Sequence, residues 1–216
     1  MSRPILYDYW RSSAAYRVRI ALNLKGVEYE SRQVDLRDDQ QKAADYRALN
    51  PQGLVPMLEI DGHRLTQSLA IINYLDLRYP NQPLIPAMAA DRAHVVILAL
   101  MVACDIHPLN NLRVLKYLAG PLGHDEAAIA AWYNHWILEG FEALERIVAH
   151  DGQAGDFCHG DAPTLADICL VPQVVNARRY NLDMAAFPTV RKIFDNCLEI
   201  EAFRNAVPEE QPDFEP

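Results

Sequence analysis

Apolar and polar positions in the first part of the chain follow strand-like and helix-like periods in turn. The aromatic and β-branched run 4–10 (PILYDYW) predicts a short strand. In 13–26 the apolar residues recur at helical spacing and Gly26 ends the run, which predicts a basic amphipathic helix. A second strand is expected at 27–36, so the chain begins with a strand, a helix and a strand.

The same region continues with a polar helix, a hairpin and a further helix. The helix expected at 38–50 ends there because Pro51 disfavours helical backbone at the residue before it. The runs LVPMLEI and HRLTQ are joined by Asp61-Gly62, a turn dipeptide typical of a β-hairpin. A helix is expected at 67–79, opened by Gln67 and Ser68 and closed before Pro80. This β-α-β-α-β-β-α order predicts an α/β domain over residues 1–82.

A proline-containing stretch at 83–90 is expected to be a linker, and the pattern after it is helical almost throughout. The predicted helical segments are 91–120, 125–149, 164–180 and 188–207. We therefore expect an all-helical domain over 91–216. The predicted fold class is α/β plus all-α in two domains, and the sequence shows no internal repeat.

Composition and charge narrow the classes of function. Half of the 216 residues are hydrophobic and 23% are charged, which is ordinary for a globular enzyme. The formal net charge of -9 argues against a general nucleic-acid binder, since phosphate contacts need a basic surface. An anionic substrate would therefore have to be bound by a local group of arginines.

The cysteines and the apolar runs bear on the cellular compartment. None of the pairs among the cysteines has C-x-x-C spacing, so we expect reduced thiols and no metal site: Cys104, Cys158, Cys169 and Cys197. The first ten residues lack the long apolar run of a signal peptide. No apolar stretch reaches membrane-spanning length. The sequence predicts a cytoplasmic protein that binds neither membranes nor nucleic acid.

Val55-Pro56 lies inside an apolar strand pattern, where proline cannot donate to a sheet ladder. Either this strand is at a sheet edge, or the proline forms a cis turn. Followed by a hairpin and a helix start at Gln67-Ser68, the cis turn fits a thioredoxin-like order of elements. A peptide-like ligand would then pair with the backbone beside the proline, and its negative end would meet the helix start at Ser68. Ser68 could instead be a simple helix cap, or it could serve both roles.

Ser12 and Ser13 occupy the strand-to-helix turn where a thioredoxin-like redox protein carries its cysteines. Without a cysteine there, disulfide exchange by a thiol of the protein is excluded. A serine hydroxyl could donate a hydrogen bond to a thiolate that belongs to a ligand, and the helix N-terminus would favour that anion. The alternative is that one of the two serines only caps the helix.

Other candidate residues have structural interpretations. Tyr7 and Tyr9, near a strand end, could activate a sulfur atom, but strand aromatics are more often core residues. His107 could be a base or a ligand contact, although a lone histidine is more often structural. Thr164 and Asp167 form a capping-box pattern before an apolar helix, which we assign to folding. Trp132 and Trp136, four residues apart on one helix, are expected in the core.

Several segments together resemble the zeta-class glutathione transferases, over nearly the whole chain. They are RSSAAYRVRIALNLKG, ALNPQGLVPMLEIDG, QSLAIINYL, DIHPLNNLRVL, GDAPTLADICLVPQVVNARRYNLD, FPTVRKI and QPD near the end. The resemblance implies a thioredoxin-like N-terminal domain and a helical C-terminal domain. It also implies glutathione held between these domains, and a homodimer.

The resemblance also assigns site residues. Ser12 matches the serine that faces the glutathione sulfur, with Ser13 beside it and Ala14 where relatives commonly carry cysteine. Further glutathione contacts are implied at Gln41, Val55, Gln67, Ser68, His107, Asn111 and Arg113. His107 stands where some relatives have glutamine. Because guanidinium groups bind carboxylates in a bidentate manner, the candidates for binding the anionic groups of a substrate are Arg11, Arg113 and Arg178. For Arg178 the alternative is a solvated charge on a helix face.

The implied activity is cis–trans isomerisation of maleylacetoacetate to fumarylacetoacetate, with glutathione as a catalyst that adds reversibly to the double bond. Ala14 removes a candidate protein nucleophile but does not affect a mechanism in which glutathione supplies the sulfur. Maleylpyruvate isomerisation is the nearest alternative. Conjugation or dehalogenation of small electrophiles, and a non-enzymatic ligand-binding role, are further alternatives.

Overall fold

A mixed sheet of four strands lies in the N-terminal part of the computed structural model, which describes residues 3–215. The strands run in the order β2-β1-β3-β4 and comprise β1 (Ile5–Asp8), β2 (Glu30–Gln33), β3 (Met57–Ile60) and β4 (His63–Thr66). β1 pairs in parallel with β2 and antiparallel with β3, and β3 pairs antiparallel with β4. The hairpin turn lies at Asp61-Gly62 as predicted, with positive φ at both residues.

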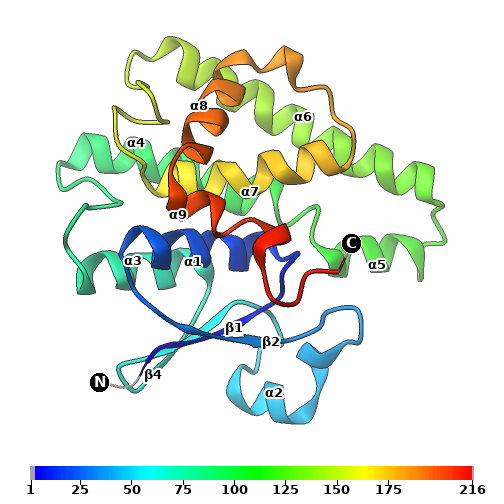
Figure 1. Ribbon diagram of the computed structural model, residues 1–216. Helices are drawn as coiled ribbons and strands as arrows, with labels where there is room; N and C mark the ends of the chain where they lie inside the picture. Colours follow the sequence, from blue (N-terminus) through cyan, green and yellow to red (C-terminus); the bar gives the residue numbers. More distant parts are fainter. Residues whose placement is uncertain (1–2, 216) are drawn as a thin grey trace. The chain divides into compact units, whose positions relative to one another are not determined.

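Helices cover both faces of this sheet. Figure 1 shows α1 (Ser13–Leu24) and α3 (Ser68–Arg78) on one face and α2 (Ala44–Leu49) on the other, where a short 3₁₀ helix (Gln40–Lys42) precedes α2. The predicted polar helix is therefore two short pieces, and its end at Asn50 is as expected. At Gly26, φ is 62°, the left-handed conformation that a helix stop favours.

The arginines of α1 are buried, so the prediction of a basic amphipathic helix is wrong. Arg17 and Arg19 are 2% and 0% exposed. Arg19 donates through Nη1 to both carboxylate oxygens of Asp8, at 2.8 and 2.9 Å, and Asp8 is itself 1% exposed. Pairing with a carboxylate and with backbone carbonyls is what permits a guanidinium to lie in the core. Helix α1 is thus an interior element.

The peptide bond Val55-Pro56 is cis, and the strand that follows it is an interior strand. The cis alternative is therefore confirmed and the edge-strand alternative is wrong. Gly53, just before it, has φ of 62°, and a Cβ atom there would lie 2.9 Å from the carbonyl oxygen of Gln41. Only glycine fits this close approach, which brings the 3₁₀ helix against the loop that leads to β3.

The helical region is built mainly from four helices. They are α4 (Ala89–Leu100), α6 (Glu126–His150), α7 (Leu165–Arg179) and α8 (Pro188–Leu198), with the shorter α5 (Leu112–Ala119) and a 3₁₀ turn (Met184–Ala186) between them. The predicted segment 91–120 is interrupted: α4 runs into a π-helical turn (Met101–Ile106), and α5 begins only after Pro108. Ile106 packs against Gly140 of α6, where any side chain would collide with it.

The predicted capping box is present at the start of α7. Thr164 and Asp167 exchange hydrogen bonds with each other's backbone and side chain, and Asp167 also accepts a hydrogen bond from the Cys158 N–H. Trp132 and Trp136 pack edge-on at 5.5 Å between ring centroids, and each is half-buried rather than in the core. The Trp132 indole N–H donates to the Leu109 carbonyl.

By compactness, the chain divides into one unit of residues up to Pro83 together with residues from Leu198 onward, and a second unit of Leu84–Cys197. The sequence predicts residues 198–215 in the helical domain, whereas by compactness they belong to the first unit, where α9 (Glu201–Arg204) lies against α1. They also include a 3₁₀ turn (Pro208–Glu210). Arg19 Nε and Asn23 Nδ2 of α1 donate to the carbonyls of Ala206 and Ala202, which supplies the hydrogen bonds that hold this segment. Among the described residues, no helix is both long and apolar enough to span a bilayer.

Candidate functional site

Ser12 is the N-cap of α1, at the turn that follows β1. Its backbone is extended, with φ of -73° and ψ of 113°, and its Oγ accepts a hydrogen bond from the Ala15 N–H at 3.2 Å. A serine hydroxyl that accepts one bond keeps its own hydrogen for donation. Because Ser12 is half-buried, that hydrogen can reach a ligand. The cap and the ligand-facing role are therefore compatible at this residue.

The start of α1 favours an anion. Helix α1 has no acidic residue in its first turn, so the positive end of its macrodipole is not offset locally. Arg11, on the loop before it, is exposed, whereas Ser13 is 8% exposed. Of the two adjacent serines, Ser12 is the more accessible, and an anion at this helix start would meet Ser12 and Arg11 first.

The start of α3 provides a second set of polar groups in the same unit. Ser68 is its first residue and is 7% exposed, and its Oγ accepts a hydrogen bond from Arg17 Nη1 at 3.4 Å. Gln67 precedes it at φ of 67° and ψ of 110°, a conformation that is costly for a residue with a side chain. The Gln67 amide donates to Gln52 Oε1 at 2.8 Å. A buried cation, a buried hydroxyl and a strained backbone therefore meet at this helix start.

Gln41 and Val55 both lie near Gly53. The Gln41 carbonyl oxygen is the atom that a Cβ at Gly53 would meet, and Val55 follows Gly53 by two residues. Gln41 is 8% exposed, and its Nε2 donates to Asp39 Oδ1 at 3.2 Å. Within the described part of the chain, no group donates a hydrogen bond to Gln41 Oε1. An acceptor buried without a donor costs free energy unless a ligand or water supplies one. Val55 is partly buried and packs against the cluster that contains Tyr7 and Met57.

The two strand tyrosines belong to the interior. Tyr7 is in that same cluster, tilted against Tyr46 at 5.9 Å between ring centroids, and its hydroxyl accepts from Arg32. Tyr9 is 4% exposed, and burial raises its pKa above the ordinary value near 10. A raised pKa makes Tyr9 a weaker source of phenolate, which agrees with its lower rank beside Ser12.

The remaining candidates for glutathione contacts lie in the helical unit. His107 follows the π-helical turn, and its backbone N–H bonds to the Val102 carbonyl. Asn111 is the N-cap of α5, and its Oδ1 accepts from the Arg113 N–H at 3.1 Å. Arg113 is exposed in the first turn of α5. Helix α5 thus begins with a capped turn that presents a guanidinium.

Arg178 has partners inside its own unit. Its guanidinium lies 4.2 Å from the centroid of the Phe194 ring, and its Nη2 is 3.5 Å from Asp195 Oδ1. Its side chain is 46% exposed. Any carboxylate that Arg178 binds must therefore compete with Asp195.

Among the described residues, no group of three or more histidine, cysteine or acidic side chains is arranged to hold a metal ion. The cysteines carry no disulfide, and all but Cys104 are buried.

Arg17, Arg19 and Asp213 have roles around the two helix starts that the sequence pattern did not indicate. Arg17 reaches Ser68, Arg19 binds Asp8, and Asp213 Oδ2 accepts the Trp10 N–H at 2.9 Å. In the sequence, Arg17 and Arg19 stand within an apolar run. Helical periodicity predicts that such charged positions face solvent, so it does not indicate their burial. Asp213 lies in the segment QPD of the family resemblance, but its contact with Trp10 joins residues 203 positions apart, so no local pattern indicates it.

The chain matches the glutathione S-transferase N-terminal domain family over residues 3–77 and the C-terminal domain family over residues 126–199. It is 52% identical to the probable maleylacetoacetate isomerase of Vibrio cholerae, over 99% of each chain. A solved holo structure of a maleylpyruvate isomerase, described as a bacterial glutathione S-transferase of the zeta class, has a TM-score of 0.96 and 48% identity. That alignment covers 98% of this chain and 100% of the other.

A second solved structure is the maleylacetoacetate isomerase of Methylobacterium extorquens with bound malonate and glutathione. It has a TM-score of 0.95 and 40% identity, and the alignment covers 98% of this chain and 100% of that one. Together these comparisons confirm the predicted fold class of a thioredoxin-like domain followed by a helical transferase domain. The chain therefore belongs to the glutathione S-transferase family, within its zeta class.

Proposed function

We propose that this chain is a glutathione-dependent cis–trans isomerase that converts maleylacetoacetate to fumarylacetoacetate, with maleylpyruvate as the alternative substrate. The relatives with these two activities support the reaction class equally, because each aligns over nearly the whole chain. The relative from Methylobacterium extorquens, solved with glutathione, also holds malonate, a small dicarboxylate, which fits the class of substrate.

The residues of the sheet unit suit glutathione. Gln41 Oε1 is a buried acceptor that lacks a donor among the described residues, and a peptide N–H of glutathione would supply one. The start of α3 would hold a carboxylate through Ser68 and the first backbone N–H groups, with the buried charge of Arg17 behind them. Val55 and Gln67 are assigned to backbone contacts with the ligand.

The observation that carries the proposal is the Ser12 hydroxyl at the start of α1. When bound, glutathione supplies a thiolate that adds reversibly to the activated double bond. Ser12 would donate a hydrogen bond to this sulfur, and the positive end of α1, which has no acidic residue in its first turn, would keep the sulfur ionised. No thiol of the protein is needed, which is consistent with alanine at position 14.

The substrate carries two carboxylates, and rotation about the former double bond moves one relative to the other. The binding groups must therefore hold each end while permitting rotation. We assign Arg11, Arg113 and Arg178 to these carboxylates, because guanidinium is the side chain best matched to them. His107 and Asn111, on the segment that leads into α5, are assigned to glutathione.

The reaction class is tested by adding maleylacetoacetate or maleylpyruvate to the purified protein, each with and without glutathione. Isomerisation of one or both that requires glutathione, without its net consumption, is the expected result. The ratio of kcat/KM values identifies the physiological substrate. Absence of glutathione-dependent isomerisation with both substrates would overturn the proposal, and stoichiometric loss of glutathione would indicate conjugation instead.

The role of Ser12 is tested by the pKa of the bound thiol. Ser12→Ala should raise that pKa, which is measured from thiolate absorbance as pH is varied. Ser13→Ala is the matched control, since Ser13 is adjacent but buried. If Ser13→Ala carries the shift, the assignment is displaced by one residue. If neither variant shifts the pKa, the serine hypothesis fails.

The arginine assignments are tested by charge removal. Arg11→Met, Arg113→Met and Arg178→Met should each lower kcat/KM for the dianionic substrate much more than for conjugation of a neutral chloronitrobenzene. Arg191→Met, at an exposed position of α8, is the control and should change neither. Equal losses on both substrates would show that the arginine supports the fold or glutathione.

The setting of this activity is also part of the proposal. We infer a cytoplasmic homodimer that acts on a small anionic enone and binds neither nucleic acid nor membranes. The net charge of -9 is consistent with the absence of a nucleic-acid surface. Sedimentation of the purified protein at twice the mass of the 24.4 kDa chain is the expected result for the dimer.

A further inference from the structure

The last described residues lie against the loop that carries Ser12. Asp213 Oδ2 accepts the backbone N–H of Trp10 at 2.9 Å, and Phe214 packs edge-on against the Trp10 ring at 5.1 Å between centroids. Figure 1 shows this C-terminal segment running past the end of α1 at which β1 enters. We call Gln211–Glu215 the C-terminal strap. It belongs to the same compact unit as the loop.

The loop between β1 and α1 is held from two sides. Arg19 Nη2 donates to the Trp10 carbonyl at 3.1 Å, so one side of Trp10 is fixed from within α1. Its N–H is fixed by Asp213 from the strap. The N–H of Ser12 donates to the Tyr9 carbonyl at 2.9 Å, which joins Ser12 to the same turn. A displacement of the Trp10 backbone is therefore transmitted to Ser12 two residues later.

The Trp10 side chain does not fix the loop by itself. Its indole Nε1 is buried and has no hydrogen-bond partner among residues 3–215. Its ring contacts are with Tyr9, at 5.7 Å, and with Phe214 of the strap. Besides its burial and the bond from Arg19, Trp10 is therefore held by one hydrogen bond and one ring contact from the strap.

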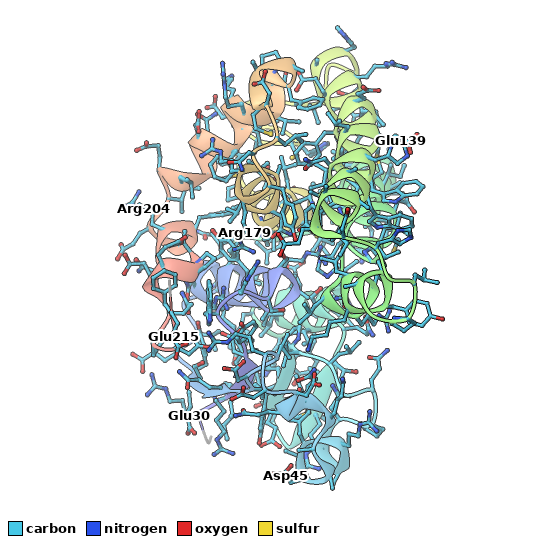
Figure 2. All side chains as sticks on the ribbon, turned by 90° about the vertical axis from the view of Figure 1, so that its right-hand side faces the viewer. Glu30, Asp45, Glu139, Arg179, Arg204 and Glu215 are labelled. Atoms are coloured by element: carbon cyan, nitrogen blue, oxygen red, sulfur yellow. The ribbon has the colours of Figure 1, made fainter. Side chains whose placement is uncertain are left out.

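The strap is held to the unit mainly by polar contacts. Gln211 Nε2 donates to the Val207 carbonyl at 2.7 Å, and Glu215 pairs with Arg37 at 2.7 Å. Figure 2 shows Glu215 on the same side as Glu30 of β2. A cavity of about 190 Å³ separates part of the strap from Tyr9 and Gln33. Because this region is not packed as core, loosening the strap should alter the loop before it unfolds the unit.

We propose that Asp213 is a positioning residue for the reaction, which acts by holding the Trp10 backbone so that the Ser12 hydroxyl faces the sulfur of bound glutathione. This rests on the proposed function of Ser12. Asp213 acts by accepting the hydrogen bond from the Trp10 N–H, and not by its negative charge. The charge alone would raise the pKa of the bound thiol, which is the opposite of what the reaction needs.

The test uses glutathione-loaded full-length protein with Asp213→Ala and Asp213→Asn. Asparagine keeps an acceptor oxygen at the same place and removes the charge. Asp213→Ala should raise the pKa of the bound thiol toward its value in free solution. It should also lower kcat/KM by about 10- to 100-fold, the effect of a misplacement of about 1 Å. Asp213→Asn should restore both quantities nearly to those of the unchanged protein.

The matched control is Asp125→Ala. Asp125 Oδ1 accepts the Ala128 N–H at 2.8 Å as the N-cap of α6, so the same kind of bond is lost in the other unit. It should leave the pKa of the bound thiol unchanged. Phe214→Leu keeps Asp213 and removes only the ring contact, and should give a smaller shift in the same direction. It replaces Asp213→Ala if that variant does not fold.

Equal thiol pKa values and equal kcat/KM for Asp213→Ala and Asp125→Ala would overturn the proposal. A lower thiol pKa in both Asp213 variants would also overturn it, since that would mean that only the charge of Asp213 acts. The thiol pKa is measured without the isomerisation substrate. If the unchanged protein binds glutathione but does not isomerise, the proposed function fails, while the positioning role is still decided by these variants.

Discussion

Asp8 and Asp167 are equally buried but are stabilised in opposite ways. Asp8, in the sheet unit, receives a guanidinium from Arg19 and one backbone N–H from Tyr9. Asp167, in the helical unit, receives the N–H groups of Cys158 and Thr164 and the Thr164 hydroxyl, and the salt bridges of the described chain do not include it. One carboxylate is balanced by a full charge and the other by dipoles alone.

The pKa values of titratable groups near each aspartate differ accordingly. Burial raises the pKa of Tyr29 to about 12, and near it the charge of Asp8 raises that pKa while Arg19 lowers it. Burial also raises the pKa of Cys158 and of Cys197, and there the charge of Asp167 adds to the effect with no opposing cation. A paired buried charge is locally cancelled, whereas a charge held by dipoles continues to act on the groups around it.

The largest effect is expected from Arg19→Met. It leaves the Asp8 carboxylate buried without its cation, and leaves the Ala206 and Trp10 carbonyls without donors. The free energy of unfolding, from urea denaturation, should fall by about 3–5 kcal/mol. Asp8→Asn in the same chain should recover part of this loss. If Arg19→Met alone lowers the free energy of unfolding by less than about 1 kcal/mol, the Asp8 carboxylate is not ionised in the folded protein.

Asp167→Ala should have the next largest effect, because three donors lose their acceptor but no charge is stranded. We expect a loss of about 1–3 kcal/mol in the same measurement. Asp167→Asn should recover little of the lost stability. Its amide has one acceptor oxygen, and its NH₂ group would face N–H or O–H donors that now bind the carboxylate. If Asp167→Ala lowers the free energy of unfolding more than Arg19→Met does, the carboxylate held by dipoles contributes more to stability than the paired one, contrary to this comparison.

The buried thiols should make stability fall at alkaline pH. The unfolded chain ionises its cysteines near pH 8.5, whereas Cys158 and Cys197 stay protonated in the folded protein. Their contribution is therefore complete below about pH 8.5 and is lost above it, by about 1.4 kcal/mol per pH unit for each thiol. Replacing both with alanine should flatten the slope of unfolding free energy between about pH 8.5 and 9.5.

Cys104→Ala is the control for that slope, since Cys104 is exposed in the folded protein. It should leave the slope unchanged. A slope that is no smaller after replacement of Cys158 and Cys197 would contradict the assignment.

The smallest effects are expected at the helix caps. Thr164→Ala and Ser12→Ala each remove a side-chain acceptor at a helix start, for a loss of about 1 kcal/mol. Thr164→Ala should cost more than Ser12→Ala, because the Thr164 hydroxyl also donates to the unpaired charge of Asp167. Equal losses would mean that this added bond contributes nothing, which calorimetric unfolding of both variants can decide.

The elements of the sheet unit could be predicted because their signals are local. The turn at Asp61-Gly62 and the stop at Gly26 act within a few residues, as does the capping box at Thr164 in the helical unit. The burial of Arg17 and Arg19 could not be predicted, because a guanidinium enters a core only when distant groups satisfy it. The return of residues from Leu198 onward to the sheet unit likewise depends on contacts that no periodic pattern encodes.

The candidate site divides in the same way. Ser12, Ser68 and Val55 stand at helix starts and beside a proline, so residue type and position were enough to single them out. The orphaned oxygen of Gln41 and the hydrogen bond of Asp213 are facts of three-dimensional packing. The resemblance to a family supplied Gln41 as a ligand contact. It also includes Asp213, in the segment QPD, but only the structure supplies a contact for that residue.

The return of the C-terminal segment to the sheet unit has a consequence for the order in which the protein can be completed during synthesis. The hydrogen bond from Arg19 to the Ala206 carbonyl joins residues 187 positions apart. Helix α1 therefore cannot make this contact until residue 206 has been synthesised and has left the ribosome. The helical unit, which is continuous in sequence, can fold before that moment. The part of the protein that is made first is thus the part that is finished last.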